Sequence, residues 1–515
     1  YTTRVLSALT LHRNATIESL DSALQIASRS ETIANLLNEL QSEIQTEELD
    51  LTRLLSEVTE LEPHLSRLAK NLPHCAVCTK LITPQQLVQI SNLLAQVSTF
   101  STAASHFSTG EHRYLILLQN SDELRATGGF AGSYIIATIA EGKLQPLIIE
   151  DIYDADGQFT GTIPAPPGVD TYLSSDKGLR LPDANWDPNF PTSAKQLFQF
   201  FSFGDRGEFE GVIAITDNYF EELLTAMDPI WLPDYQLTVT PENLTDVLRS
   251  DRSDFFAGSI QKKHLLEQFQ NQLVIQLSSI DLRQAAMITL SHMYQKNILL
   301  YSRNEQIQTI IEELSADGSL ISKNSTAFLA FVESNVGINK ANKHISRAMA
   351  ISREGTSLRV WYLLQNDNEP PQTTELTEVG NLSPSPTLKT ASAAANHLGY
   401  INYQRILYPK SWEITSLSYN SEPLPLSETT TETIPYPNLK ETSQTGFLVT
   451  LPEKSVGLLE VVFTLPETTP TPLELELYKQ PGTLPFPIWI EPTTPQIFDT
   501  NPTMILEKNS DTIIP

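Results

Sequence analysis

The chain has 515 residues, too many for one ordinary hydrophobic core, and this length predicts roughly two to four folded units. Hydrophobic residues make up 40% of the chain, which excludes a wholly disordered protein. The 61 acidic and 34 basic residues give a net charge of -27, and such a surface repels phosphate backbones, which argues against nucleic acid as a partner.

The start of the chain and its two cysteines both bear on where the protein is located. The sequence opens at Tyr1 rather than at Met, so we expect a signal or anchor upstream, and no run of 18 apolar residues spans a bilayer. Cys75 and Cys78, in "PHCAVCTK", predict a local disulfide that pins a loop. Metal or redox chemistry is the alternative, but a zinc site would need two more ligands, and only His64 and His74 lie near.

Residues 1–110 have the apolar periodicity of helices, which predicts a helical bundle. The clearest repeat consists of Ile33, Leu36, Leu37, Leu40 and Ile44. The alternative is a coiled coil that oligomerises or that spaces the rest of the chain from a membrane.

The period changes at Tyr114, where "YLILLQ" predicts a buried central strand. The stretch "SYIIATIAEGKLQPLIIEDIY" then predicts two strands joined by a turn at Glu141 and Gly142. Further on, "FEGVIAITDNYFEELLTAM" and "NILLYSRNEQIQTIIEEL" each predict a strand that runs into a helix. This alternation predicts an α/β sandwich over residues 111–352.

Residues 353–515 change character again, to short strands separated by Pro, Gly, Asn and Thr, as in "LRVWYLLQND" and "VGLLEVVFTLP". This pattern predicts a β-sandwich-like region. The expected fold class is therefore a multi-domain α+β protein with a helical bundle, a central α/β sandwich and a C-terminal β-rich part.

The loop "QNSDELRATGG" draws attention because an arginine and two glycines follow a predicted central strand. A nucleotide loop needs its glycines between a strand and a helix, whereas Gly128 and Gly129 lead into a second strand, so we expect a positive φ or a bulge there. Arg125 has two interpretations. It either pairs with Asp122 and Glu123, or it binds a phosphate or carboxylate ligand in bidentate fashion at the strand end.

The candidate ligand pocket at this loop combines residues from three segments. It comprises Asn120, Asp122, Glu123, Arg125, Gly128, Gly129, Asn185, Trp186 and Lys340. Trp186 either plugs its loop into the core, which we favour, or forms a wall on which a sugar stacks. The sequence contains no G-x-S-x-G, H-E-x-x-H or Walker motif, so no catalytic residue is assigned.

A second candidate is the acidic stretch "DIYDADG", in which Asp151, Asp154 and Asp156 could bind Mg²⁺ or Ca²⁺ through oxygen. The helix–loop–helix calcium pattern fails, because its first and twelfth positions fall on Ile152 and Ile163. A solvated acidic loop is therefore favoured over a metal site, and the sequence indicates no other cofactor.

Several segments carry a family resemblance, above all "YLILLQNSDELRATGGFAGSYIIATIAEGKL", with "LPDANWDPNFPTSAKQL", "VESNVGINKANKHISR" and "LELELYKQPGT". They resemble a large bacterial family of envelope proteins, domain of unknown function four thousand and twelve. The resemblance implies an extracellular protein on the cell surface, anchored to the membrane through a segment upstream of Tyr1. It also implies that the helical bundle of residues 1–110 lies next to the membrane.

A fainter similarity connects the chain with the LytR-CpsA-Psr family, which transfers glycopolymers from polyprenyl pyrophosphate carriers to the cell wall. That similarity implies that Arg125 holds pyrophosphate and that Asp122 or Asp151 holds a metal. A transferase pocket would carry several arginines, whereas only Arg125 is found near the strand ends, with Lys340 or Arg347 as helpers, and this scarcity favours a non-catalytic role. Fold-level similarity does not fix function, however.

Two hypotheses follow. The first is a structural or interaction protein of the cell surface, whose partners are other envelope proteins or further copies of itself. The second is an envelope phosphotransferase that acts on polyprenyl-linked cell-wall glycopolymers. An open pocket at Arg125 favours the second hypothesis, and an Arg125 buried in ion pairs favours the first.

Overall fold

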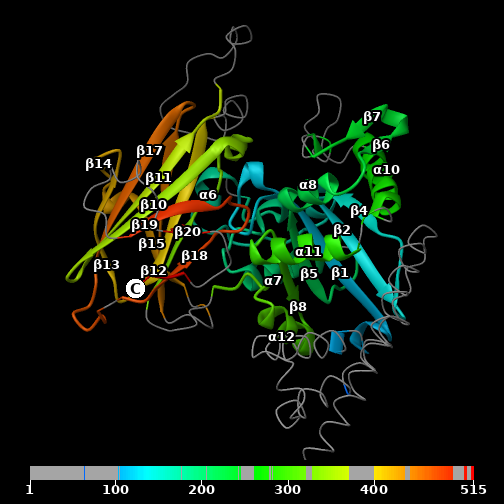
Figure 1. Ribbon diagram of the computed structural model, residues 1–515, viewed down its shortest axis with the longest axis horizontal. Helices are drawn as coiled ribbons and strands as arrows, with labels where there is room; N and C mark the ends of the chain where they lie inside the picture. Colours follow the sequence, from blue (N-terminus) through cyan, green and yellow to red (C-terminus); the bar gives the residue numbers. More distant parts are fainter. Residues whose placement is uncertain are drawn as a thin grey trace, which may run out of the picture.

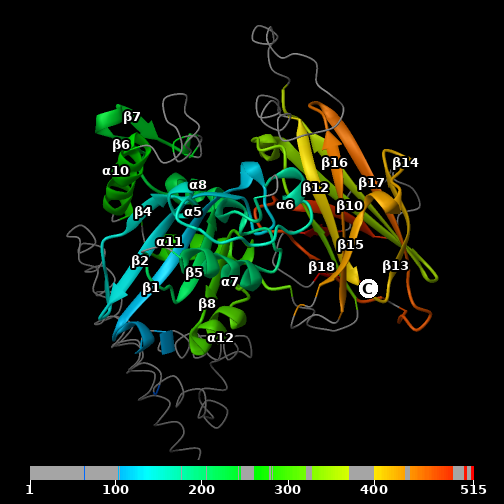
Figure 2. The same ribbon diagram turned by 180° about the vertical axis from the view of Figure 1, so that it is seen from behind.

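The computed structural model shows a mixed α+β protein in which an α/β part and a β-sandwich lie side by side (Figures 1 and 2). It describes Pro63 and residues 102–515, without 104, 175–176, 204–205, 242, 245–246, 248–259, 278–279, 281, 321–326, 370–398, 435, 437–440, 472, 491–503, 507–511 and 515. The predicted helical bundle lies almost entirely outside the described residues, as does the Cys75–Cys78 pair.

The α/β part is built on one mixed sheet, with strand order β3-β2-β1-β5-β8 and with β4 also paired to β2. Its strands are β1 (Glu111–Asn120), β2 (Phe130–Ala140), β3 (Lys143–Leu144), β4 (Ile148–Asp151), β5 (Gly211–Thr216) and β8 (Ile298–Ser302). β1 runs antiparallel to β2 and parallel to β5. The predicted central strand is thus confirmed, and so is the turn after β2, because Glu141 and Gly142 have φ of 50° and 76°, as a tight hairpin turn requires.

Helices accompany this sheet in the α/β part. They are α5 (Ile152–Asp156), α6 (Val169–Tyr172), α7 (Phe190–Phe201), α8 (Asp217–Thr225), α10 (Ile260–Leu277), α11 (Leu282–Tyr294) and α12 (Glu305–Glu313). In α7, Phe190, Leu197 and Phe201 share one core with Leu115 and Leu117 of β1. α8 and α10 belong to a second cluster, beside the hairpin of β6 (Ile230–Leu232) and β7 (Leu237–Val239). None of the described helices combines the length and the apolar character that crossing a membrane demands.

The β-sandwich consists of two sheets that share one apolar core. The first sheet has the order β14 (Glu422–Pro423), β13 (Glu413–Tyr419), β17 (Ser455–Thr464), β11 (Ser357–Asn366), β10 (Ile345–Glu354), β19 (Phe486–Ile490) and β20 (Met504–Leu506). The second has the order β15 (Thr430–Ile434), β16 (Thr442–Leu451), β12 (Tyr400–Pro409), β9 (Phe328–Val332), β18 (Leu475–Tyr478) and β21 (Thr512–Ile514). Side chains from both inner faces interdigitate, as in other sandwiches.

One boundary differs from the prediction. β9 and β10 pair with β12, β18, β11 and β19 of the sandwich, so the change of sheet precedes residue 328 instead of following residue 352. The cause is that "FLAFV" is buried along its whole length and reads as a central strand of either sheet type. Apolar periodicity identifies a strand but not the strands beside it.

Candidate functional site

The loop between β1 and β2 is a compact turn whose glycines are needed for backbone geometry. Asn120 caps the short 3-10 helix η3 (Ser121–Glu123), because its side chain accepts from the amide of Asp122 at 2.9 Å. Gly128 has φ of +129°, and a Cβ on Gly129 would lie 2.2 Å from the carbonyl oxygen of Asn120. Both positions therefore require glycine, and the predicted positive φ is confirmed at Gly128.

Arg125 is buried in ion pairs. Only 1% of its surface is exposed, its Nε donates to Asp183 Oδ1 at 3.1 Å, and its Nη2 donates to Glu123 Oε1 at 3.0 Å. Its Nη1 donates to the carbonyl oxygen of Asn335 at 2.6 Å. Burial alone would lower the pKa of Arg125, but the carboxylates of Asp183 and Glu123 outweigh it and raise that pKa. The predicted pairing with Glu123 is confirmed, and Asp183 is a second partner that the sequence did not indicate.

The same loop forms part of the contact surface between the α/β part and the β-sandwich. The amide of Leu124 donates to Asn342 Oδ1 at 3.1 Å, and its carbonyl accepts from the amide of Asn335 at 2.9 Å. Gln480 Nε2 donates to the carbonyl of Arg125 at 3.0 Å. These contacts use both backbone and side chains, so the loop is fixed against residues that follow β9 and β18.

Two glycines bring the backbones together at this junction. Gly482 has φ of +75°, and a Cβ there would lie 2.0 Å from the carbonyl oxygen of Gly128. A side chain on either glycine would force the facing backbone to move. The α/β part and the sandwich are therefore in direct backbone contact at the Arg125 loop.

Asn185 and Trp186 complete the junction from the α/β side. Asn185 Nδ2 donates to the carbonyl of Gly129 at 2.8 Å. Trp186 is 3% exposed, stacks on Tyr403 of β12 with ring centroids 5.8 Å apart, and has Arg405 over its ring at 4.6 Å. This burial supports the interpretation of Trp186 as a plug and not as an open wall for a sugar. Lys340 lies half-buried at the start of η6 (Ala341–His344).

The acidic stretch after β4 does not gather its oxygens. Asp151 caps α5, where it accepts from the amide of Tyr153 at 2.9 Å. Asp156 forms an ion pair with Arg180 at 2.5 Å and also accepts from the amide of Leu181. Within the described part of the chain, Asp151, Asp154 and Asp156 are not among the groups whose ligand atoms lie close enough to share an ion. Capping and ion pairing explain why two of these carboxylates are buried.

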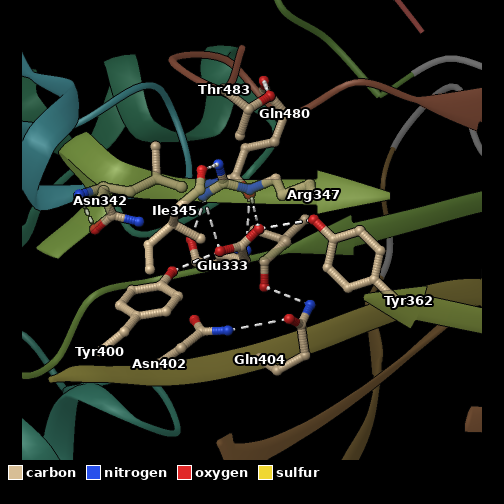
Figure 3. A network of polar contacts seen from close by, with 12 residues as sticks. Glu333, Asn342, Ile345, Arg347, Tyr362, Tyr400, Asn402, Gln404, Gln480 and Thr483 are labelled. Atoms are coloured by element: carbon tan, nitrogen blue, oxygen red, sulfur yellow. Dashed lines mark hydrogen bonds and ion pairs between the residues drawn. The ribbon is translucent and has the colours of Figure 1, made fainter. Parts of the chain in front are cut away.

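A second polar network lies between the two sheets of the sandwich, centred on Glu333 (Figure 3). This carboxylate is fully buried and accepts from Arg347 Nε at 2.5 Å and from Arg347 Nη2 at 3.0 Å. It also accepts from the hydroxyls of Tyr362 and Tyr400 at 2.7 and 2.6 Å. Burial would raise the pKa of Glu333, but the guanidinium of Arg347 and the two hydroxyls outweigh it, so the pKa lies below its usual value.

Gln480 joins this network to the Arg125 loop. Its Nε2 donates to the carbonyls of both Arg125 and Glu333, and its Oε1 accepts from the amide of Glu333 at 2.7 Å. Thr483 in turn donates to the carbonyl of Gln480 at 2.7 Å. One amide side chain thus spans the loop and the sandwich, and Arg347 is engaged with Glu333 instead of assisting at Arg125.

Lys479 is a buried cation next to this junction. Its Nζ donates to the carbonyls of Gln295 at 3.0 Å and Gln480 at 3.5 Å. Burial lowers the pKa of Lys479 to about 7, and the positive charge of Arg347 acts in the same direction. This lysine sits in the segment "YKQPGT", where the sequence gives no sign of burial.

An open pocket of about 530 Å³ lies away from the Arg125 loop, between α7, β8 and α12. Its lining includes Lys195, Tyr301, Arg303 and Asp317. Burial raises the pKa of Asp317, although hydrogen bonds from Ser319 act against it. None of the nine residues predicted for the ligand pocket lines this space.

Sequence reasoning missed the residues that complete the junction: Asp183, Glu333, Asn335, Asn342 and Gln480. They lie in the segments that carry the family resemblance, but nothing in their local pattern marks them. Asn335 is 210 residues and Gln480 is 355 residues from Arg125, so only the fold brings them to it.

Residues 109–252 match the family described as "Protein of unknown function (DUF4012)", which confirms the predicted resemblance over that segment. No curated protein matches the chain. The transcriptional regulator yvhJ from Bacillus subtilis is 13% identical, with a TM-score of 0.24 over 40% of this chain and 77% of that one. B. subtilis TagV is 12% identical, with a TM-score of 0.22 over 40% of this chain and 80% of that one. With TM-scores this low, neither structure supports a conclusion about this chain.

Proposed function

We propose that this chain is a non-catalytic structural protein of the bacterial cell envelope, in which the α/β part and the sandwich act as one rigid body on the outer face of the membrane. The observation that supports this most is the use of Arg125. Arg125, in the segment with the most specific family resemblance, binds Glu123, Asp183 and the backbone carbonyl of Asn335 within the junction between the two parts.

The competing role for Arg125, holding a pyrophosphate, asks for a guanidinium edge that a ligand can reach. Here Nε, Nη1 and Nη2 each donate to protein oxygen, and the side chain is 1% exposed. A phosphate at Arg125 would have to displace two carboxylates and open the junction. A structural role needs no such rearrangement.

The envelope assignment rests on the family match over residues 109–252 and on the charge of -27, which keeps a surface protein soluble and apart from other acidic polymers. The family resemblance implies that an anchor upstream of Tyr1 holds it at the membrane. Its partners would be other envelope proteins or copies of itself. Cell-wall glycopolymer would be a substrate only under the phosphotransferase alternative.

The location is tested by fractionating bacteria that produce the full-length protein and by treating intact cells with protease. We expect the protein in the envelope fraction and its digestion from outside the cell. Recovery in the cytosol, with protection from external protease, would contradict the proposal.

Binding of a polyprenyl pyrophosphate carrier, which the phosphotransferase alternative requires, is tested in the presence of Mg²⁺. Geranyl pyrophosphate serves as a short probe for that carrier. We expect no saturable binding by calorimetry. Saturable binding that is lost in Arg125→Lys, while circular dichroism shows an intact fold, would establish the phosphotransferase alternative instead.

A further inference from the structure

Three side chains of metal-ligating type meet at the edge of the central sheet opposite to the Arg125 loop. His106 lies in the helical turn before β1, His112 is the second residue of β1, and Glu210 directly precedes β5. Because β1 and β5 run parallel with Tyr114 beside Gly211, Glu210 falls at the same edge as the start of β1. Over the described ranges, these three form the one group of such residues whose ligand atoms all lie within 4.8 Å of one another.

The contacts within this group are short and converge on one carboxylate. His106 Nε2 lies 2.6 Å from Glu210 Oε1, and His112 Nδ1 lies 2.6 Å from Glu210 Oε2. The three side chains are 14%, 11% and 20% exposed, so solvent and small ions reach them but do not surround them. Tyr114 donates its hydroxyl to Glu210 Oε1 at 2.9 Å and orients the carboxylate.

The contacts at both ring nitrogens of His112 require either a second proton on the imidazole or a cation beside it. Its Nε2 lies 2.8 Å from the carbonyl oxygen of Thr109, which can only accept. A neutral imidazole carries a single N–H, so donation to Thr109 leaves Nδ1 with a lone pair that faces the carboxylate of Glu210. A metal ion between Nδ1 and Glu210 resolves that conflict, and the Thr109 carbonyl then fixes the ligating tautomer as outer partners of metal-bound histidines do.

We propose that His106 Nε2, His112 Nδ1 and Glu210 bind a single divalent transition metal of the Zn²⁺ class, with water in the fourth position. Two imidazoles and one carboxylate are a donor set that zinc takes, at about 2.0–2.2 Å from each atom. Tetrahedral ligand atoms are then about 3.3 Å apart, so the two 2.6 Å contacts have to open by about 0.7 Å. Small side-chain rotations at this partly exposed edge provide that movement.

The position of the site indicates a tethering role. Open α/β sheets place their chemistry at the carboxyl ends of the strands, whereas this group lies at the amino end of β1. A metal here would join the turn that contains His106 to both central strands. It would thus fix the segment that enters the sheet.

The test uses the full chain, stripped with a chelator and titrated with ZnCl₂ by calorimetry. We expect one equivalent to bind and the melting temperature to rise with zinc, because the metal binds the folded state. His112→Ala and Glu210→Gln should each weaken binding by more than about tenfold, the lower bound for losing even an outer partner. His264→Ala, at an exposed histidine 3.7 Å from Asp234, is the matched control and should leave affinity unchanged.

Two further measurements identify the ligands. Co²⁺ in place of zinc should give visible absorption without a thiolate charge-transfer band, which separates this site from Cys75 and Cys78. His106 Nδ1 lies 3.4 Å from the side-chain nitrogen Nδ2 of Asn304, whose Oδ1 caps α12. Asn304→Asp keeps an oxygen for the cap and gives His106 an acceptor, so it should tighten zinc binding.

The proposal is overturned if zinc does not bind, if binding is unchanged in both His112→Ala and Glu210→Gln, or if the cobalt spectrum shows thiolate ligation. Unchanged affinity in Asn304→Asp would exclude His106 and with it the three-ligand site. If His112 takes a second proton instead of a metal, zinc will not bind.

Discussion

Replacing Arg125 by methionine tests whether this residue serves the fold or a ligand. The substitution keeps the apolar stem but removes the guanidinium, so Glu123 and Asp183 lose their shared counter-ion and the carbonyl of Asn335 loses a donor. Removing one partner of a buried ion pair costs about 3–5 kcal/mol. Asp183 keeps 15% of its side chain in contact with solvent, which relieves part of this cost, while the orphaned carbonyl adds about 1–3 kcal/mol. We therefore expect a loss of about 3–5 kcal/mol in the free energy of unfolding.

The assay is urea unfolding followed by tryptophan fluorescence, because Trp186 is buried in the same junction. Arg359→Met is the matched control. It makes the same change in the ion pair of Arg359 with Glu460, whose side chains are 51% and 30% exposed, and should lower the free energy of unfolding by no more than about 1 kcal/mol. In the Arg125→Met background, Glu123→Gln should restore part of the loss, since it removes one uncompensated charge. A loss below about 1 kcal/mol for Arg125→Met would refute a structural role.

Three further predictions concern the same region. Glu333→Gln should cost about 3–5 kcal/mol in urea unfolding, because it leaves the buried guanidinium of Arg347 without its carboxylate. For Lys479 the folded pKa of about 7 lies below the unfolded value of 10.5, so the unfolded state binds more protons between these values and stability rises with pH across that window. In urea unfolding at pH 7 and 9, the free energy of unfolding of the parent chain should rise by up to about 1.4 kcal/mol per pH unit, and Lys479→Met should lack this rise. Equal pH slopes in the two proteins would contradict this prediction. Gly482→Ala should lower the melting temperature much more than Gly355→Ala. Both glycines have positive φ, which costs an alanine about 1–2 kcal/mol at either position. Only at Gly482 would the new Cβ also meet backbone, 2.0 Å from the carbonyl oxygen of Gly128.

Local structure was predictable wherever the signal is local. The run "YLILLQ" identified β1, the Glu141–Gly142 turn identified a hairpin, and strand-to-helix alternation identified β5 with α8 and β8 with α12. The positive φ of Gly128 also followed from sequence, since the two glycines lead into a second strand. These features depend on side-chain alternation and backbone freedom within about ten residues.

Partners were not predictable, because they depend on which distant strands meet. Arg125 was recognised, and Glu123 beside it, but Asp183 and Asn335 lie 58 and 210 residues away. The same reason explains the boundary error at β9 and β10, and it explains why His106 and His112 passed unnoticed without Glu210, which is 98 residues beyond His112. Asp151 and Asp156 illustrate the converse, since an acidic cluster in sequence became a helix cap and an ion pair.

The separation of Gln480 from Arg125 has a consequence for how the protein is made. The α/β part leaves the ribosome first, with Arg125 and the turn at Gly128 lacking the residues that cover them. The chain must grow by 355 residues before Gln480 arrives, which takes about 20–70 s at about 5–20 residues per second. During that interval Arg125 has Glu123 and Asp183 as partners, but its loop lacks the contacts to Asn335, Asn342 and Gln480. Chains truncated before these residues therefore leave this polar surface uncovered. Closure of the Arg125 loop is thus a late event of biosynthesis, and the sandwich seals the domain that precedes it.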